Sequence, residues 1–387
     1  MMTDDTPYWL ALTLVKGVGA KTILRLVSAF GSARHVWEAT RNSLLDADVP
    51  ETLVSNLLKA RSSFDFDNEL EKVRKTGASL ITLDDGNYPP LLRKIDSPPP
   101  LLYVLGELEP TDANGIAIVG TRSASRYGRE ATYKIAQELA RHGITIISGL
   151  AQGIDTAAHR GALAVEGRTI GVLGCGIDRI YPEQSKALVD DILQKKRGAI
   201  ISEFSIGTPP TGTNFPRRNR ILSGLGRGVL VAEAPEGSGS LITADFALEQ
   251  GRDVFALPAN INTNGAAGTN RLIQEGATLI TEAADILKEL TVVVLPPTNQ
   301  VMPKAKTVQR PTRSAPKKLE PSPVSVPTDL SEHEQALYTL LDHTSQHIDD
   351  LIRKSGLRTD IVISTITILE LKGLAQMVAP MQYCRSH

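Results

Sequence analysis

Residues 115–122 read GIAIVGTR, a short apolar run that ends in Gly-Thr-Arg, and this run decides the fold. Further short apolar runs follow at 144–148, 169–173, 199–202, 228–232 and 254–257, separated by longer stretches in which apolar residues recur at helical spacing. Runs this short and rich in β-branched residues are typical of strands buried on both faces, and the helices between them supply right-handed crossovers. The sequence therefore predicts a doubly wound α/β domain.

Two of the predicted strands end in small residues suited to anion binding. The first ends in Gly120-Thr121-Arg122 and the second in Ser148-Gly149. A glycine ahead of a helix exposes backbone amides to an anion, and the planar guanidinium of Arg122 suits a phosphate. Ligands of doubly wound sheets bind beyond the carboxyl ends of the strands. We therefore expect these residues to bind phosphate, with an ion pair across the end of the sheet as the alternative for Arg122.

The densest positive cluster of the α/β region lies at residues 214–220, NFPRRNR. Pro216 suits the first turn of a helix, and cations at that end oppose the helix dipole unless an anion compensates them. Phosphates and an aromatic ring for base stacking are what a single-strand site requires. The predicted nucleic-acid contacts here are Phe215, Arg217, Arg218, Asn219 and Arg220. In the alternative interpretation the arginines bond to loop carbonyls and Phe215 lies in the core.

A further glycine-rich helix start, Ser238-Gly239-Ser240, follows the predicted strand at 228–232 and adds a second phosphate-compatible turn. Asp155 and His159 lie one helical turn apart, which suits either an acid-base pair or, more commonly, a structural pair. Residues 171–176, GVLGCG, do not form the G-x-G-x-x-G dinucleotide motif, and no P-loop motif occurs. We expect no catalytic residues and no cofactor.

Composition narrows the function further. The chain has 387 residues with a formal net charge of -1, so a nucleic-acid site has to be local. The only cysteines, Cys175 and Cys384, are too few for a zinc site or a disulfide framework, so we expect no metal and a reducing compartment. The N-terminus does not resemble a signal peptide, and no stretch of about 20 apolar residues could span a membrane. We expect a cytoplasmic protein without membrane contact.

The chain is predicted to divide at changes of pattern. Residues 1–83 form a helical domain in which residues 15–22, VKGVGAKT, resemble the turn of a helix-hairpin-helix; a contact to a DNA phosphate and a plain helix-helix turn remain equally open. A proline-rich stretch opens the α/β domain, residues 84–291. Residues 292–328 are a proline-rich, cationic linker, and residues 329–387, which begin with a capping box at Ser331, have the element order of a winged helix.

The ordered motifs of the α/β region resemble the DNA-processing protein A (DprA, also called Smf) family. They comprise Gly120-Thr121-Arg122, Tyr127-Gly128, residues 148–151, residues 153–155, Ala158-His159, Tyr181-Pro182, Ser202-Glu203, Asn214-Phe215, residues 218–220, Glu233-Ala234 and residues 238–240. The resemblance implies a Rossmann-like doubly wound sheet between a helical domain, SAM-like or helix-hairpin-helix-like, and a winged helix. It also implies sequence-independent, cooperative binding of single-stranded DNA and loading of the RecA recombinase during natural transformation and DNA recombination.

The same resemblance implies a homodimer, for which Leu272 and Ile273 are the candidate interface residues. Two positions depart from the family pattern. Ala259 stands where a glycine is usual, and Thr211-Gly212-Thr213 lacks a lysine found in some members, for which Arg217 is the candidate substitute.

Two other functions remain open. A nucleotide phosphoribohydrolase would place its site at Glu233, Glu236 and residues 237–240, and would release a base or ribose phosphate from a nucleotide. A winged-helix transcription factor would prefer one duplex sequence.

Overall fold

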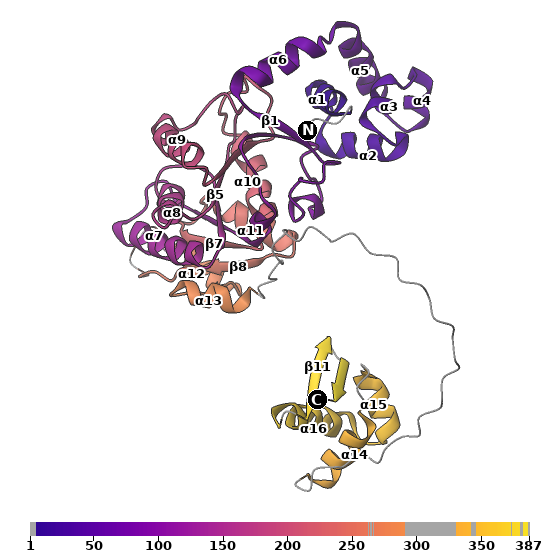
Figure 1. Ribbon diagram of the computed structural model, residues 1–387, viewed down its shortest axis with the longest axis vertical. Helices are drawn as coiled ribbons and strands as arrows, with labels where there is room; N and C mark the ends of the chain where they lie inside the picture. Colours follow the sequence, from indigo (N-terminus) through magenta and orange to yellow (C-terminus); the bar gives the residue numbers. More distant parts are fainter. Residues whose placement is uncertain are drawn as a thin grey trace, which may run out of the picture. The chain divides into compact units, whose positions relative to one another are not determined.

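The computed structural model describes residues 5–290, 330–341 and 346–385, apart from residues 262, 264, 266, 373, 380 and 381. The chain divides into two compact units, Met1–Asn299 and Gln300–His387, and each is described by itself (Figure 1). The predicted linker, 292–328, lies outside the described residues.

A nine-stranded sheet forms the centre of the first unit, in the order β1-β2-β6-β5-β4-β3-β7-β8-β9. The strands are β1 (Ser79–Thr82), β2 (Leu101–Gly106), β3 (Gly115–Gly120), β4 (Thr145–Ser148), β5 (Thr169–Val172), β6 (Gly198–Ser202), β7 (Gly228–Glu233), β8 (Asp253–Ala256) and β9 (Thr278–Leu279). Strands β3 to β9 pair in parallel, whereas β2 is antiparallel to both of its neighbours. The predicted doubly wound α/β fold is confirmed, and each of the predicted runs is a strand within one residue of its expected bounds.

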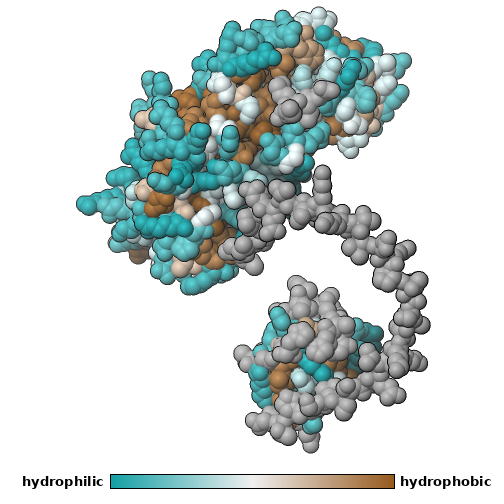
Figure 2. All heavy atoms as spheres, viewed as in Figure 1, coloured by the Kyte–Doolittle hydropathy of each residue, from teal (hydrophilic) through white to brown (hydrophobic). Residues whose placement is uncertain are grey.

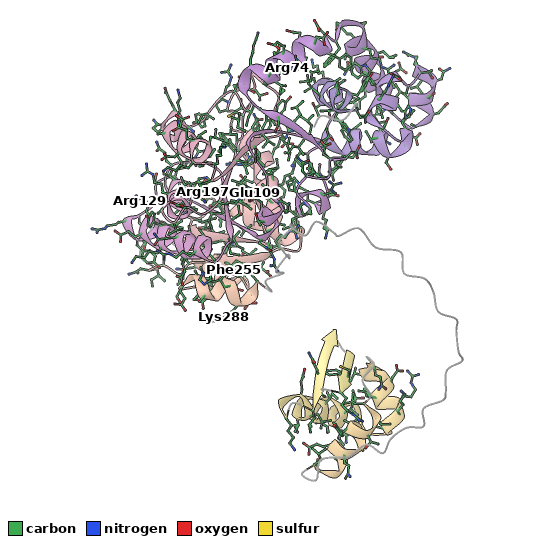
Figure 3. All side chains as sticks on the ribbon, viewed as in Figure 1. Arg74, Glu109, Arg129, Arg197, Phe255 and Lys288 are labelled. Carbon is green, nitrogen blue, oxygen red and sulfur yellow. The ribbon has the colours of Figure 1, made fainter. Side chains whose placement is uncertain are left out.

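Helices cover both faces of this sheet. They are α7 (Arg126–Arg141), α8 (Ile154–Leu163), α9 (Lys186–Gln194), α10 (Asn214–Leu225), α11 (Leu241–Glu249), α12 (Ala267–Gln274) and α13 (Ala283–Glu289). Alternate residues of β3 serve the two faces: Ile116 and Ile118 pack with α7, α8 and α13, whereas Ala117 and Val119 pack with α10, α11 and α12. This alternation is why the β3 run is apolar throughout. Figure 3 shows two extremes of the layer: Phe255 of β8 is fully buried, and Lys288 of α13 lies at the surface.

Six helices precede the sheet, as the sequence predicts. They are α1 (Thr6–Leu14), α2 (Ala20–Phe30), α3 (Ala33–Glu38), α4 (Arg41–Asp46), α5 (Glu51–Ser63) and α6 (Phe66–Thr76). Gly17, between α1 and α2, has φ +83°, which favours glycine in the predicted turn. One hydrophobic cluster runs from Trp9 of α1 to Tyr103 of β2 and Ile200 of β6, so the helices share a core with the sheet.

The proline-rich stretch that opens the α/β domain also contains a strand of the sheet. Short 3-10 turns at Leu92–Lys94 and Pro110–Asn114 flank β2, which lies inside the sheet. Strand β1 falls within the predicted helical domain, yet it pairs with β2, and a boundary between residues 83 and 84 therefore cuts a hairpin of the sheet. Proline confines its own position to loops but does not prevent a strand that starts directly after it.

The second unit has the order predicted for a winged helix. It contains α14 (Glu332–Leu340), β10 (Gln346–His347), α15 (Ile348–Ser355), α16 (Thr359–Leu371), β11 (Ala375–Ala379) and β12 (Gln382–Arg385). Ser331 and Glu334 form the predicted capping box. In α16, which occupies the position of the recognition helix in a winged helix, Ser364 is exposed but Thr365 is buried.

Hydrophilic residues cover most of the helix surfaces of the first unit, with apolar residues showing between them (Figure 2). Among the described residues, no helix combines the length and the apolar character needed to cross a membrane.

Candidate nucleic-acid interface

The candidate site lies where the strand order reverses, between β3 and β7. The backbone N–H of Thr121 donates to the carbonyl oxygen of Glu233 at 2.7 Å, which joins the carboxyl ends of the two strands. A cleft of about 340 Å³ opens beside this bond. Its walls include Gly120, Thr121, Arg122, Ser123, Ala151, Asp155, Phe215, Arg218, Asn219, Ser238, Gly239, Ser240 and Ile242. Ligands of doubly wound sheets bind at such a switch point.

The loop after β3 is held in place from two sides. Ser125 donates to the carboxylate of Glu233 through its backbone N–H, at 3.0 Å to Oε2, and through its hydroxyl, at 2.8 Å. On the other side Gly153, at φ +81°, lies against the loop, and a Cβ there would collide with the carbonyl oxygens of Thr121 and Arg122. The loop can therefore present Arg122 in one fixed position.

The loop after β4 supports the residues of the cleft and has few polar groups free to bind a ligand. The Ser148 hydroxyl is buried and donates to the Ile118 carbonyl at 2.6 Å. Asp155 of α8 accepts hydrogen bonds from the backbone N–H groups of Gly149, at 3.0 Å, and Ala151, at 3.3 Å. The prediction that Ser148 and Gly149 contact phosphate is not supported, because both are buried and their polar groups bind within the protein.

Arg218, one of the predicted phosphate ligands, is buried in α10. Its guanidinium donates to the carbonyl oxygens of Gly149, at 3.0 Å, and Val172, and its Nε donates to Asn219 Oδ1 at 3.2 Å. Burial lowers the pKa of Arg218, while the nearby carboxylate of Asp155 raises it. The bonds to loop carbonyls match the alternative that the sequence left open, so Arg218 lines the cleft as a structural residue.

Arg220 is engaged in a similar way. It forms an ion pair with Glu203 in which both side chains are largely buried, with exposed fractions of 13% and 7%. Arg220, which lies beyond the first turn of α10, is therefore compensated by a carboxylate of the protein. Arg220 is not among the residues that line the cleft.

Arg122 and Arg217 are the exposed arginines of the predicted set. The Arg122 guanidinium lies 5.2 Å from the centroid of the Phe215 ring, and Arg217 lies 5.4 Å from the ring of Phe204. Neither forms an ion pair with a carboxylate within the described part of the chain. Of the two, only Arg122 lines the cleft, so it is the cation available to an anion bound there.

The opposite wall comes from the turn that opens α11. Asn219 Nδ2 donates to the Gly239 carbonyl at 3.0 Å, which ties α10 to this turn. The hydroxyls of Ser238 and Ser240 are 2.8 Å apart, and the backbone N–H of Ser240 donates to Ser238 Oγ. All four residues, which the sequence predicts to bind nucleic acid or phosphate, line the cleft, and the Asn219 side chain is bonded to Gly239.

Asp155 and His159 are both buried, and each bonds to a different part of the protein. His159 Nδ1 lies 2.7 Å from Thr169 Oγ1, whose hydroxyl donates to the Ile146 carbonyl, so Nδ1 carries the proton. Burial, with a smaller effect of the Arg218 charge, lowers the pKa of His159 to about 3. Burial raises the pKa of Asp155 to about 6, against the opposing effect of Arg218. His159 does not line the cleft, and no cluster of potential metal ligands occurs among the described residues.

The carboxylates invoked for a phosphoribohydrolase are poorly placed. Glu233 is buried with both oxygens accepting from Ser125, and neither Glu233 nor Glu236 lines the cleft. A general acid or base has to reach the bond that it cleaves. The geometry therefore weighs against this alternative.

The two candidate dimer residues have different environments. Leu272 of α12 is 7% exposed and packs in the core of its own chain, so it cannot supply an interface as predicted. Ile273, next to it, is partly exposed. Ala259 exchanges two hydrogen bonds with the Asn270 side chain and has no positive φ, so the alanine fits the backbone here.

Sequence reasoning missed several residues at the site. Ser123 and Ile242 line the cleft, and the ring of Tyr181 lies 5.9 Å from that of Phe215. Tyr181-Pro182 was available as a motif, but its position beside Phe215 depends on how the loop after β5 folds back over α10.

Comparisons with known proteins agree with this architecture. The family model described as DNA recombination-mediator protein A matches residues 79–291, and the model of the DprA winged helix domain matches residues 319–379. The chain is 36% identical to Protein Smf of Synechocystis sp. over all of both chains. It is 40% identical to Protein Smf of Escherichia coli over 74% of this chain and 75% of that protein.

Two solved structures are similar. The X-ray structure of DNA processing protein A from Streptococcus pneumoniae has a TM-score of 0.67 and 36% identity, and covers 73% of this chain and 98% of that one. The structure of DNA processing protein A from Helicobacter pylori, described as giving insights into its single-stranded DNA binding mode, has a TM-score of 0.50 and 31% identity, and covers 56% of this chain and 97% of that one. The family model spans the whole sheet and its site, and the chain therefore belongs to the DNA recombination-mediator protein A (DprA/Smf) family.

Proposed function

We propose that the cleft between β3 and β7 binds single-stranded DNA without regard to base sequence. The observation that carries this proposal is Arg122, an exposed arginine that lines the cleft, has no carboxylate partner within the described residues and is held against an aromatic ring. A fixed guanidinium beside an aromatic residue matches the chemistry of a strand's phosphates and bases. The Helicobacter pylori relative is described as binding single-stranded DNA.

The lining supports contact with the backbone of the strand. Opposite Arg122 lie Ser238, Gly239 and Ser240 at the start of α11, where amide dipoles favour an anion. The cleft, at about 340 Å³, suits a nucleotide of a flexible strand rather than the rigid cylinder of a duplex. Contacts to phosphates fix the position of a strand but carry no sequence information.

The test is fluorescence anisotropy with labelled oligonucleotides of equal length, as single strands of different sequence and as a duplex, at several salt concentrations. Each phosphate neutralised on a single strand contributes a slope of roughly -0.7 in the log-log salt plot, so Arg122 in the cleft predicts about -0.7, and a further phosphate contact to Arg217 outside the cleft would bring the slope to about -1.4. This is below the value of -2 to -3 expected if Arg218 and Arg220 also bound phosphate. A flat salt response, or tighter binding of the duplex, contradicts the proposal.

We further propose that the DNA-bound protein is a homodimer without catalytic activity that loads RecA onto the strand during transformation and recombination. Membership of a recombination-mediator family supports this step. The measurement is the rate of RecA filament formation on single-stranded DNA covered with a single-strand binding protein. An Arg122→Ala variant should fail to accelerate filament formation, and equal acceleration by wild type and variant would separate RecA loading from the cleft.

A further inference from the structure

Tyr181 is an exposed aromatic residue on a well-anchored loop. It is 40% exposed, and Tyr127 is the other aromatic residue with a largely exposed side chain in the described part of the chain. The loop is fixed before the tyrosine, where Cys175 Sγ donates to the Arg179 carbonyl. It is also fixed after the tyrosine, where the buried Ser185 hydroxyl donates to the Leu150 carbonyl at 2.6 Å. Apolar surface held open to water on a rigid backbone is characteristic of a binding position.

Phe215, which the sequence singles out for base stacking, is enclosed by its neighbours. Arg122 lies over its ring at 5.2 Å, and Tyr181 packs against it at 5.9 Å with an interplanar angle of 40°. On another side a Cβ at Gly174 would come within 2.9 Å of Phe215 Cδ1, so the backbone there approaches the ring closely. A base could stack on Phe215 only by displacing one of these groups.

We propose that a base of the bound strand stacks on Tyr181, whereas Phe215 holds the side chains of Arg122 and Tyr181 in position beneath that base. This inference rests on the proposed function, and it adds the base-contacting residue of the same site. The ring of Phe215 contacts both Arg122 and Tyr181. Because Phe215 lines the cleft and Tyr181 lies beyond it, the three side chains form a row that leads out of the cleft. A strand whose phosphate meets Arg122 thus has an aromatic surface for a neighbouring base.

The surroundings of Tyr181 carry charges of both signs and include cations that a strand could contact. Arg179 and Lys186, on either side of it in the sequence, are exposed, as is Glu183. The carboxylate of Asp178 pairs with Arg179 at 3.8 Å, and its Oδ1 accepts from the backbone N–H of Gly207 at 2.9 Å. Stacking on an aromatic ring tolerates any base, because every base has a π face. A contact through Tyr181 is therefore compatible with binding that does not depend on sequence.

The test compares a thymidine oligonucleotide with an abasic strand of the same length, which keeps every phosphate and lacks the bases. Dissociation constants for both strands are measured with wild type, Tyr181→Ala, Tyr181→Phe and the matched control Tyr127→Ala, an exposed tyrosine of α7. Loss of one stacked base weakens binding by roughly tenfold. Wild type, Tyr181→Phe and Tyr127→Ala should prefer the thymidine strand by about this factor, and Tyr181→Ala should lose most of the preference while binding the abasic strand as before.

The outcomes separate the inference from the proposed function. If wild type binds both strands equally well, or if Tyr181→Ala keeps the preference, the site binds DNA but Tyr181 does not stack a base. If wild type binds neither strand, the proposed function fails and this inference with it. If Tyr181→Ala weakens both strands to the same extent, circular dichroism distinguishes unfolding from a phosphate-positioning role, and either result contradicts stacking.

Discussion

Arg218 Nη1 donates a hydrogen bond of 3.0 Å to the carbonyl oxygen of Gly149, so the start of α10 is tied to the loop after β4. A side chain bonded in this way holds two walls of the cleft together, with its Nε and Nη1 donating to groups of the protein. The arginines of the NFPRRNR cluster therefore divide by environment, with Arg218 and Arg220 inside the protein and Arg217 at its surface. Stability and DNA affinity should accordingly respond to different arginines.

Arg122→Ala is expected to weaken single-strand binding about tenfold or more, because a charge-assisted contact to phosphate contributes roughly 1.5 to 3 kcal/mol. The salt slope should decrease in magnitude by about 0.7, and the melting temperature should stay nearly constant because the side chain is exposed. Arg126→Ala is the matched control, since Arg126 is an exposed arginine of α7 paired with Glu130. Equal losses in both variants would mean that net charge alone drives binding.

Arg220→Ala is expected to show the opposite behaviour. It leaves the Glu203 carboxylate buried without its partner, and breaking a buried pair on one side costs about 3 to 5 kcal/mol. Urea denaturation measures this loss, and the affinity for DNA, corrected for the folded fraction, should be unchanged. The double variant Arg220→Ala/Glu203→Ala should recover part of the stability. If Arg220→Ala were stable but bound DNA weakly, Arg220 would contact the DNA after all.

The apolar runs were sufficient to predict the strands of the central sheet, because a strand buried on both faces has to be apolar throughout. Strands β1 and β9 are short edge strands without that pattern, whereas β2 reads LLYVLG and shows it but was not predicted because it directly follows a run of prolines. Their assignment depends on pairing with distant residues, such as Leu102 of β2 with Ile81 of β1, which no local pattern encodes.

The candidate site was predictable as a position but not as a set of ligands. Gly120 and Ser238 stand at strand ends and helix starts, which local patterns identify. The fate of each arginine depends on groups that are distant in sequence, such as Glu203 for Arg220 and the Val172 carbonyl for Arg218. Tyr181 was overlooked for the same reason, since its partner Phe215 lies on another element.

His159→Asn is expected to change how stability depends on pH. The folded-state pKa of His159, about 3, lies below its ordinary value of 6.5. The stabilisation that comes from keeping His159 neutral is therefore fully present above pH 6.5 and is lost as the pH falls toward 3. A single such proton gives a slope of about 1.4 kcal/mol per pH unit. Asparagine has an amide that can replace the Nδ1 donor to Thr169 without titrating.

The pKa of Asp155, raised to about 6, has the opposite effect on stability. The free energy of unfolding that depends on Asp155 increases as the pH falls from 6 toward 3.8, because the folded protein binds the proton more tightly. The two groups oppose each other between pH 6 and 4 in wild type, and His159→Asn should therefore gain stability on acidification over this range relative to wild type. Urea denaturation at several pH values measures the difference. Parallel curves for the two proteins would show that His159 takes up a proton in the folded state at its ordinary pKa.

Ile273→Asp is expected to convert the proposed dimer into a monomer without unfolding the chain. Ile273 is partly exposed on α12 and packs against the core cluster in which Leu272 is buried, so part of its side chain remains available to a partner. A charge at the centre of an apolar interface loses its hydration without gaining a partner, which weakens association. Leu272→Asp should instead unfold the protein, because the carboxylate would have to be buried.

Sedimentation velocity and thermal melting of both variants measure the two effects. An Ile273→Asp protein that melts and sediments as the wild-type dimer would place the interface on another surface, whereas a wild-type monomer would remove the dimer from the proposed function.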